Sequence, residues 1–527
     1  MPGPSDHDRD AIDDGNLLPR IHRLPADWTA ERAFEHLCSL PGCLWLDSAD
    51  RERSEQSAGI TDSFSSEQPA SPQALNRYSF VTADPVAWLT ETDPWQTLEN
   101  WCDRLPAHNA DDLPPFQGGI AGLIGYEAGS LLEPTGVSAG DDLSTPPMAL
   151  GLYDVVIAID HDTATSVLIS QGYGPDGSRC ADRARTRAEK FLNHLRDSTS
   201  TDASGERPDR PRDKTGGKSP HDLFLGDDSP PPAPSASSAP ADPTGISSNF
   251  TGREFRKAVD EIVNRIGRGD SFQVNLAQRL SAPATCGASQ LYESLRRENP
   301  APFAGFLDAG DFQVLSSSPE GFLQVRNRNV ETRPIKGTVP RTGDRELDEA
   351  HAARLMGSKK DRAENVMIVD LMRNDLSRVC QDKSVVVKQL CKLECYQYVQ
   401  HLVSVVAGTL RDECSIVDLL KASFPGGSVT GAPKIEAMRT IACLEPHRRG
   451  AYCGSLGYIS SQADADFNIL IRTITAADGA WYFPVGGGIT ARSDSRSELE
   501  ETWTKAEGML RAIEASKDPK TTFQDPL

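Results

Sequence analysis

Apolar residues recur at helical spacing directly after Thr251. Thr251 and Glu254 have the spacing of a capping box, and glycines follow at positions 267 and 269. A capping box stabilises the start of a helix, and glycine favours its end. The pattern therefore predicts a helix beginning near 251 and ending near 267, with an apolar side formed by Phe255, Val259, Ile262, Val263 and Ile266.

Further helical and strand patterns fill the rest of the C-terminal half. Apolar positions mostly alternate over 272–280, which predicts a half-buried strand. Helical spacing returns over about 346–379 and 496–515. Short β-rich runs are predicted at 384–390, 456–460, 469–475 and 481–485. Because strands and helices occur in blocks, the expected fold class is α+β.

Composition divides the chain into regions. Residues 198–248 are rich in Pro, Ser and charged residues, which predicts a disordered linker. The linker separates an N-terminal region, 17–197, from a C-terminal catalytic domain, 249–516. We expect residues 1–16 and 517–527 to be tails, and 51–75 to be a surface loop.

Charge and cysteine content narrow the class of protein. The formal net charge of −21 argues against nucleic-acid binding, which favours basic surfaces. No apolar run reaches the roughly 18 residues of a membrane helix, and the acidic N-terminus does not resemble a secretory signal. The 11 scattered cysteines are typical of reduced thiols rather than of a zinc site. We expect a cytoplasmic protein without a membrane or nucleic-acid partner.

Two acidic pairs are candidates for a metal site. Asp361 and Glu364 lie three residues apart in one predicted helix, and Glu498 and Glu501 do so in another. If the two helices face each other, these carboxylates supply the hard oxygen ligands that Mg²⁺ prefers. The alternative is that both pairs are solvated helix faces, and spacing alone favours that interpretation.

Two glycine-rich segments are candidates for anion binding. Residues 424–434 read FPGGSVTGAPK and lead into a helical pattern, so the segment presents free N–H groups to an anion. Gly486, Gly487 and Gly488 are expected to form a loop after the strand at 481–485, where glycine permits close approach of a ligand. The alternative for each segment is an ordinary tight turn.

Lys336 and Glu320 are candidates for covalent and acid catalysis. A lysine whose pKa is lowered becomes a free amine and hence a nucleophile. A shielded carboxyl group stays protonated and acts as a general acid. Most lysines are simply solvated, and the sequence does not show that these two residues meet.

Eight ordered motifs resemble one family, the chorismate-utilising enzymes. They are SSSPE, RPIKGT, ENVMIVDLMRNDLSRV, QHLVSVVAGTL, GGSVTGAPKIEAMR, NILIRTI, GGGIT and ELEETWTKA. The family includes anthranilate, aminodeoxychorismate, isochorismate and salicylate synthases. The resemblance implies an α+β sandwich of two large β-sheets flanked by helices.

The resemblance also implies which ligand each candidate residue binds. It places Mg²⁺ on Glu364 and Glu501, with Asp361 and Glu498 as secondary ligands. It places the carboxylates of chorismate near Arg472, Ser428, Gly486 and Gly488, and His401 beside the ring. A loose match to family segments that bind tryptophan involves Ser48, Asn299 and Pro300.

Two positions favour the aminodeoxychorismate synthase branch. Lys336 lies in PIKGT, whereas anthranilate synthases resemble PIAGT, and Gln273 stands where isochorismate synthases have a lysine base. The implied reaction is amination of chorismate at C4, with Lys336 attacking C2 and Glu320 protonating the leaving hydroxyl. No glutaminase motif is found, so a glutamine amidotransferase partner is expected. Val339, Arg492 and Gly321 depart from the usual family residues.

Two alternatives remain. One is anthranilate synthase component I, from which Lys336 distinguishes the sequence. The other is a non-catalytic relative that binds an amidotransferase, against which the retained site residues count.

Overall fold

A computed structural model of the chain describes residues 18–48, 77–89, 93–105, 113–138, 140–143, 145–197, 245–396 and 399–517. The expected loop at 51–75, the tail at 1–16, nearly all of the tail at 517–527 and most of the expected linker lie outside these ranges. Only the end of the linker range is described, and it contains the short strand β9 (Ser247–Ser248).

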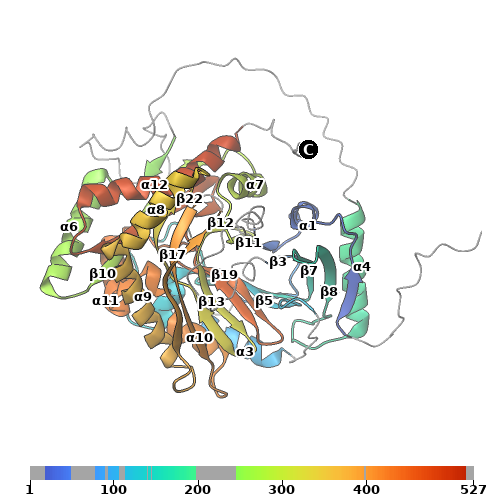
Figure 1. The fold of residues 1–527 in the computed structure, drawn as a ribbon. Helices are drawn as coiled ribbons and strands as arrows, with labels where there is room; N and C mark the ends of the chain where they lie inside the picture. The colour runs from blue at the N-terminus through green and yellow to red at the C-terminus, as the bar shows by residue number, and fades with distance from the viewer. Residues whose placement is uncertain are drawn as a thin grey trace, which may run out of the picture.

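Two large antiparallel sheets form the body of the molecule (Figure 1). The first has 12 strands, with β9 paired to β10 beside the main path. Its order is β1 (Arg20–Arg23), β8 (Thr165–Ser170), β7 (Val155–Asp160), β3 (Tyr78–Thr82), β2 (Leu44–Asp47), β11 (Phe303–Asp308), β12 (Gln313–Ser318), β21 (Thr473–Ala477), β22 (Ala480–Thr490), β10 (Gln273–Pro283) and β18 (Gly431–Ala432).

The second sheet has 10 strands, with β16 (Val386–Cys395) paired to β17 beside the main path. Its order is β15 (Ile335–Pro340), β17 (Val399–Thr409), β14 (Asn329–Thr332), β13 (Gly321–Arg326), β20 (Ala465–Asn468), β19 (Ser455–Ser460), β5 (Gly119–Ile124), β6 (Met148–Tyr153) and β4 (Ala87–Trp88). Strands from before and after residues 198–244 therefore share both sheets, and the two parts of the chain pack as one body.

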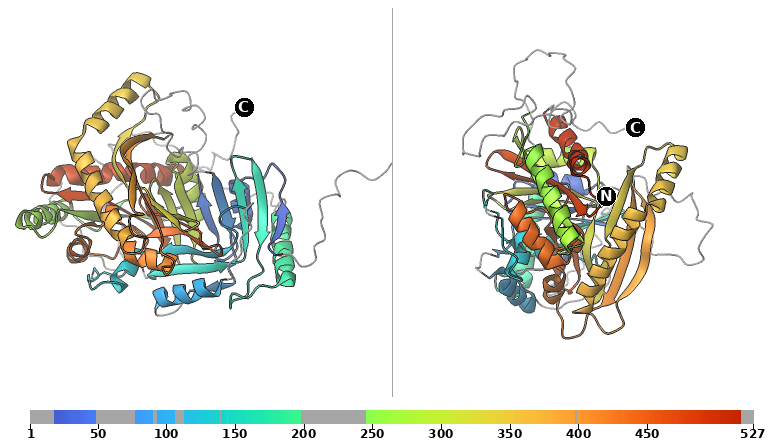
Figure 2. Two further views of the ribbon diagram at one scale, coloured as in Figure 1. Left: turned by 60° about the horizontal axis from the view of Figure 1, so that its bottom comes forward. Right: turned by 90° about the vertical axis from the view of Figure 1, so that its left-hand side faces the viewer.

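Helices flank the sheets. They are α1 (Ala30–Leu37), α3 (Pro94–Arg104), η2 (Tyr126–Leu131), α4 (Ala181–Asp197), α6 (Gly252–Arg268), α7 (Ala288–Glu298), α8 (Arg345–Gly357), α9 (Lys359–Ser377), α10 (Ile416–Ser423), η3 (Gly427–Val429), α11 (Lys434–Leu444) and α12 (Ser495–Ala515). Figures 1 and 2 show α6, α8, α9 and α12 toward one end of the molecule and α4 at the other. The predicted α+β sandwich is confirmed. None of the described helices is long and apolar enough to cross a membrane.

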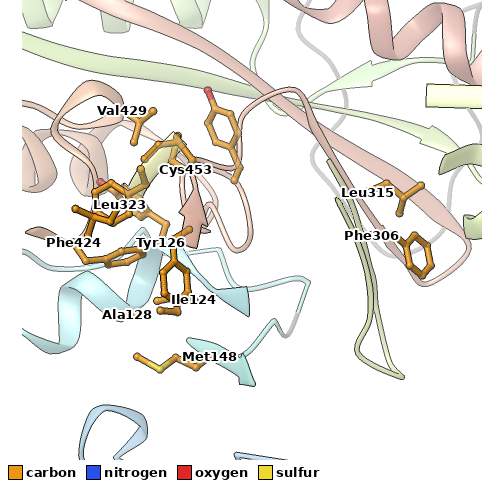
Figure 3. Close-up of a cluster of buried hydrophobic side chains, with 14 of the residues drawn as sticks. Ile124, Tyr126, Ala128, Met148, Phe306, Leu315, Leu323, Phe424, Val429 and Cys453 are labelled. Carbon is orange, nitrogen blue, oxygen red and sulfur yellow. The ribbon is translucent and has the colours of Figure 1, made fainter. Parts of the chain in front are cut away.

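Buried apolar side chains fill the space between the layers. Figure 3 shows part of this core, where Leu323 of β13 and Met148 of β6 lie near Tyr126 of η2 and Phe424. These residues come from distant parts of the sequence, and their burial removes apolar area from water. The core fixes the segment that begins at Phe424, which carries Ser428 toward the site.

Local sequence explains most element boundaries. Both hydrogen bonds of the capping box at Thr251 and Glu254 are present, and Gly269 ends α6 with φ 88°. The helical region predicted over 346–379 is two helices, because Ser358 ends α8 and its side chain caps α9. The strand predicted at 469–475 begins only at Thr473, since the preceding residues carry the chain from one sheet to the other.

The expected loop at Gly486–Gly488 is wrong. All three glycines lie inside β22, where Gly486 is opposite Ala277, Gly487 opposite Leu276 and Gly488 opposite Asn275 of β10. The long ladder with β10 supplies backbone hydrogen bonds that outweigh the weak strand preference of glycine. The glycines therefore lie within a strand, on which Gly487 faces the opposite side from Gly486 and Gly488.

Candidate active site

The chain crosses from one sheet to the other at two places, and these crossings bring the candidate residues together. Glu320 lies between β12 of the first sheet and β13 of the second. Arg472 lies between β20 of the second sheet and β21 of the first, and has φ 50°. The site thus lies where the chain crosses between the sheets, and residues far apart in the sequence approach one another there.

Lys336, Glu320 and Ser428 form a connected group. The Lys336 Nζ donates to the carbonyl oxygen of Ser428 at 3.1 Å. The side chain of Ser428 hydrogen-bonds the carboxyl group of Glu320. Glu320 is 5% exposed and Ser428 is 6% exposed, so the group is shielded from water. The structure brings together the two catalytic candidates that the sequence could not connect.

Burial shifts the pKa values of this pair toward the neutral forms. It raises the pKa of Glu320, although Lys336 and the bonds to Ser428 and Ile335 act in the other direction. It lowers the pKa of Lys336, although Glu320 and Glu364 oppose the shift. Removal of a group from water penalises its charged form. A neutral amine beside a carboxylic acid is the arrangement that nucleophilic and acid catalysis require.

His401 lies on β17 beside Thr338 and Arg472. Its Nδ1 is 2.9 Å from the Thr338 hydroxyl, and its Nε2 is buried without a hydrogen-bond partner among the described residues. Burial, with a further contribution from the Arg472 guanidinium, lowers the pKa of His401 to about 3. The imidazole is therefore neutral at physiological pH, with one nitrogen free to meet a ligand.

Arg472 has no anionic partner among the described residues. Its guanidinium makes no hydrogen bond or ion pair with the described part of the chain, and burial lowers its pKa. A buried, unpaired guanidinium is costly, and a carboxylate held by two parallel hydrogen bonds relieves that cost. Arg472 is therefore suited to an anionic substrate.

The two acidic helices do face each other. The charge of Glu498 on α12 acts on Glu364 of α9, whose pKa is raised mainly by burial. Glu501 forms an ion pair with Lys505 at 2.7 Å, and its pKa is lowered because Lys505 outweighs burial. Asp361 lies at the start of α9, where its Cγ is 3.1 Å from the position that a Cβ on Gly337 would occupy. The four carboxylates therefore border the segment that carries Lys336.

Gly487 of β22 lies beside these carboxylates and has no side chain to fill the space there. A Cβ on Gly487 would lie 3.5 Å from Glu498 Oε2, 3.5 Å from Glu501 Oε1 and 3.4 Å from Lys505 Nζ. Lys505 also donates to the carbonyl oxygen of Gly486 at 2.8 Å. The missing side chain leaves room beside the acidic groups, which a larger residue would fill.

The carboxylates fit Mg²⁺ only as an incomplete ligand set. Within the described ranges, no group of three or more His, Cys, Asp or Glu side chains is gathered closely enough to hold a metal unaided. Mg²⁺ usually takes one or two protein carboxylates and completes its shell with water and substrate oxygens. Among the described residues, Glu364 Oε1 is buried with no hydrogen-bond partner, and so has a lone pair available for such an ion.

Gln273 lies against the same glycine strand. Its side-chain amide is fully buried, and neither Oε1 nor Nε2 has a hydrogen-bond partner in the described structure. A Cβ on Gly488 would lie 2.4 Å from Gln273 Nε2, so a larger residue there would displace the end of the Gln273 side chain. An amide both buried and unpaired is suited to a small polar ligand.

The residues suggested for tryptophan lie at one end of the β2–β11 pair. Ser48 follows β2 and donates to the carbonyl oxygen of Tyr78 at 2.9 Å. Asn299 ends α7 and precedes Pro300, shortly before β11. Because β2 and β11 are adjacent, these residues are near one another. Residues 49–76 lie outside the described ranges, and tryptophan binding stays a prediction.

Two departures from the family pattern have local explanations. Val339 is 4% exposed and packs with Leu355 and Leu402 under α8. Gly321 lies beneath Phe303, whose ring would be 2.8 Å from an added Cβ. Nothing in the structure explains Arg492.

Sequence reasoning missed Thr338, Gly487 and Lys360 as site residues. Thr338 contacts His401 across two strands, which no local pattern reveals. The sequence predicts Gly487 only as part of a loop, whereas it lies in a strand beside Glu498 and Glu501. Lys360 Nζ lies 4.0 Å from Glu364 Oε1. In the sequence, only its position next to Asp361 and near Glu364 indicates that it belongs to the site.

Comparisons with known proteins identify the family of the chain. The family model of the chorismate binding enzymes matches residues 41–511. An aminodeoxychorismate synthase component 1 of Salmonella typhimurium is 38% identical over 457 residues, which is 83% of this chain and 90% of the relative. An anthranilate synthase component 1 of Streptomyces coelicolor is 36% identical over 441 residues, which is 83% of this chain and 81% of the relative.

A solved structure is similar as well. The anthranilate synthase component I from Streptococcus pneumoniae aligns with a TM-score of 0.67 and 30% sequence identity, and the alignment covers 86% of this chain and 96% of that one. The predicted family resemblance is confirmed over most of the chain. By its sequence, its two-sheet fold and the matched range, the chain belongs to the chorismate binding enzymes.

Proposed function

We propose that the chain is the chorismate-aminating component of an aminodeoxychorismate synthase, which converts chorismate and ammonia to 4-amino-4-deoxychorismate. The observation that carries the proposal is the shielded pair of Lys336 and Glu320, joined through Ser428. The similarity to several aminodeoxychorismate synthase components supports the same assignment. The product would supply 4-aminobenzoate and folate synthesis.

The first step uses the neutral forms of the pair. The Lys336 amine forms a bond to ring carbon C2, the ring double bonds shift, and the C4–O bond breaks. Glu320 gives its proton to the departing oxygen, which leaves as water, and the carboxyl group becomes a carboxylate. Lowering of the Lys336 pKa and raising of the Glu320 pKa both favour this starting state.

In the second step the ring double bonds shift back to their original positions. Ammonia forms a bond to C4, the double bonds return, and the C2–N bond to Lys336 breaks. Lys336, bonded to C2 as an ammonium, leaves as the free amine, and the new C4 ammonium gives a proton to the Glu320 carboxylate, which restores both groups for the next turnover. Covalent catalysis of this kind divides one difficult displacement into two easier ones. Because the lysine occupies C2 first, the nitrogen of the product is attached at C4.

The remaining site residues have binding roles in the proposal. Arg472, the amide groups of the 424–434 segment and the strand at Gly486 and Gly488 would hold the carboxylates of chorismate. His401 would lie beside the ring and accept a hydrogen bond at Nε2. Gln273 would contact the ring region or the incoming ammonia through its unpaired amide.

Mg²⁺ is part of the proposal. Glu364 and Glu501 would hold it, with Asp361 and Glu498 nearby, and water and substrate oxygens would complete the ligand shell that this ion prefers. When bound, the ion would neutralise carboxylate charge on the substrate within an acidic chain.

Ammonia would come from a glutamine amidotransferase subunit. The designation of the relatives as component 1 supports a partner component. We also propose a cytoplasmic location, which the scattered cysteines of the sequence support because reduced thiols persist in a reducing compartment.

The test is identification of the product. The purified chain is incubated with chorismate, Mg²⁺ and ammonium at alkaline pH, and the product is analysed by mass and chromatography, with and without an aminodeoxychorismate lyase. Conversion of the product to 4-aminobenzoate by that lyase is the expected result. Fluorescent 2-aminobenzoate formed without the lyase would establish anthranilate synthase instead, which similarity to those enzymes keeps as the second candidate.

A further inference from the structure

The short turn that carries Ser428 is held only weakly by its own backbone. In this turn, η3, the Val429 N–H donates to the Gly426 carbonyl oxygen at 3.3 Å. The Thr430 N–H donates to the Gly427 carbonyl oxygen at 3.4 Å. Both distances exceed the usual range for such bonds, about 2.7–3.2 Å. Contacts from other elements are therefore needed to fix the position of Ser428.

Arg449, between α11 and β19, makes such a contact. Its guanidinium donates to the carbonyl oxygen of Val429 at 2.9 Å and to that of Asn275 in β10 at 3.1 Å. Hydrogen bonds from a charged donor are shorter and stronger than those between neutral groups. Arg449 therefore ties the residue after Ser428 to the strand that carries Gln273.

Two acidic side chains hold Arg449 in turn. Glu445 accepts two bonds from the guanidinium, at 2.9 and 2.6 Å, and a third from the backbone N–H of Ala277 at 2.9 Å. Glu127 of η2 accepts from the backbone N–H groups of Arg449 at 2.8 Å and Gly450 at 3.0 Å. The side chains of Arg449 and Glu445 are each 3% exposed, so water does not compete for their bonds. Residues from before and after 198–244 thus fix the guanidinium in one place.

Ser428 is the residue through which this support reaches the reacting groups. Its carbonyl oxygen accepts from Lys336 Nζ at 3.1 Å, and its side chain hydrogen-bonds Glu320. The carbonyl groups of Ser428 and Val429 belong to consecutive planar peptide units, and only the two backbone dihedral angles of Val429 separate them. A bond that holds the Val429 carbonyl therefore restricts movement of the Ser428 carbonyl.

We propose that Arg449 is a positioning residue, which fixes Ser428 and thereby the placement of Lys336 relative to Glu320. The inference rests on the proposed function, because it assigns a residue to the alignment that the first step of that function requires. Arg449 acts through the backbone of Val429 and takes no part in the bond changes. Displacement of a reacting group by about 1 Å can lower a rate by around 10²-fold, so loss of this support has a measurable effect.

Arg449→Lys tests the role. Lysine keeps a positive charge beside Glu445, but it lacks the planar fork of donors that serves Glu445, Val429 and Asn275 together. The variant is assayed with chorismate, Mg²⁺ and ammonium, and kcat/KM for chorismate is measured over a pH range. Thermal unfolding of the same samples measures stability.

Arg187→Lys is the matched control. Arg187 of α4 also makes an ion pair within the protein, because it donates to Asp154 at 2.9 Å, and the two side chains are 16% and 0% exposed. Its second acidic partner is Asp84. All three residues lie in the N-terminal part of the chain, and none is a candidate site residue. The control therefore reports the effect of weakening a buried ion pair away from the site.

The expected result is a lower rate together with a displaced pH profile. Arg449→Lys lowers kcat/KM by about tenfold, which corresponds to ~1.4 kcal/mol of lost transition-state stabilisation. The apparent pKa values of its profile move by about half a unit or more, because each bond of Ser428 acts on one member of the Lys336–Glu320 pair. A smaller amount of folded protein would lower the rate without moving the profile. Arg187→Lys unfolds at a lower temperature but keeps the wild-type kcat/KM and profile.

Arg449→Met combined with Glu445→Gln serves if Arg449→Lys does not fold. The two changes remove both buried charges at once, so neither is left unpaired. Glutamine keeps an acceptor for the Ala277 N–H. The same fall in rate and the same displacement are expected, because the bond to Val429 is lost here too.

Wild-type kinetics in either folded variant, or a lower rate with an unmoved profile, would overturn the positioning role while leaving the proposed function intact. Absence of ammonium-driven amination by the wild-type chain would instead overturn the proposed function, and the role of Arg449 with it.

Discussion

Lys336 and Glu320 are held by the same residue, Ser428. The lysine donates to the Ser428 carbonyl oxygen at 3.1 Å, and the carboxyl group is hydrogen-bonded by the Ser428 side chain. Burial raises the pKa of the acid and lowers the pKa of the amine. Both shifts favour the carboxylic acid and the free amine, the forms that the proposed first step consumes.

This pair predicts a bell-shaped pH dependence of kcat/KM for chorismate. Lys336 must be deprotonated, so the rate rises with pH through its pKa, which is lowered from 10.5. Glu320 must be protonated, so the rate falls as pH rises through its pKa, which is raised from 4.5. The two limbs report the coupled pair rather than either residue alone. The measurement is steady-state kinetics over a pH range, with ammonia expressed as the concentration of free NH₃.

Glu320→Gln should remove the alkaline limb, because glutamine does not give up a proton in this range. The loss of the general acid should lower kcat by about 10²–10⁴-fold. A Glu320→Gln variant with a wild-type profile would show that another group protonates the leaving hydroxyl.

Thr338 should set the orientation of His401. Its hydroxyl is 2.9 Å from His401 Nδ1, and this contact leaves the unpaired Nε2 for the ligand. Thr338→Val removes the hydroxyl at constant volume and should lower kcat about tenfold, an effect of ~1.4 kcal/mol. Thr338→Ser keeps the hydroxyl and should retain most of the activity. Equal rates for the valine, serine and wild-type proteins would refute the assignment.

Gly487→Ala should raise the Mg²⁺ concentration that gives half-maximal activity. The added methyl would lie 3.5 Å from oxygens of Glu498 and Glu501, in the space proposed for the ion and its water. We expect a shift of about tenfold, the lower end of what changes around a metal site produce. Titration of activity with Mg²⁺ measures it. Gly267→Ala is the control, since an added Cβ there meets nothing within 4 Å, and equal Mg²⁺ requirements in the two variants would contradict the prediction.

The sequence predicts those features of the fold that depend on nearby residues. The capping box at Thr251 and Glu254 marks the start of α6 because its hydrogen bonds span three residues. The alternating pattern after Phe272 marks β10 for a similar reason. The loop expected at Gly486–Gly488 fails because pairing with β10, more than two hundred residues away, determines that segment.

For the candidate site, too, the sequence predicts the residues but not the contacts between them. The motifs identify Lys336, Glu320, Glu364 and Glu501 as candidates, but only the passages between the sheets explain how they meet. The contact of Thr338 with His401 depends on the pairing of β15 with β17, and sequence spacing carries no information about it. That Arg472 has no anionic partner among the described residues likewise emerges only from the folded structure.

The most direct test of the account is the rate of C4 amination by Lys336→Ala with saturating ammonium, chorismate and Mg²⁺. The predicted result is a fall of at least about 10³-fold, or redirection to another product, as expected when a covalent nucleophile is removed. Formation of the C4-aminated product at the wild-type rate would contradict the covalent route and the function assigned to the Lys336–Glu320 pair.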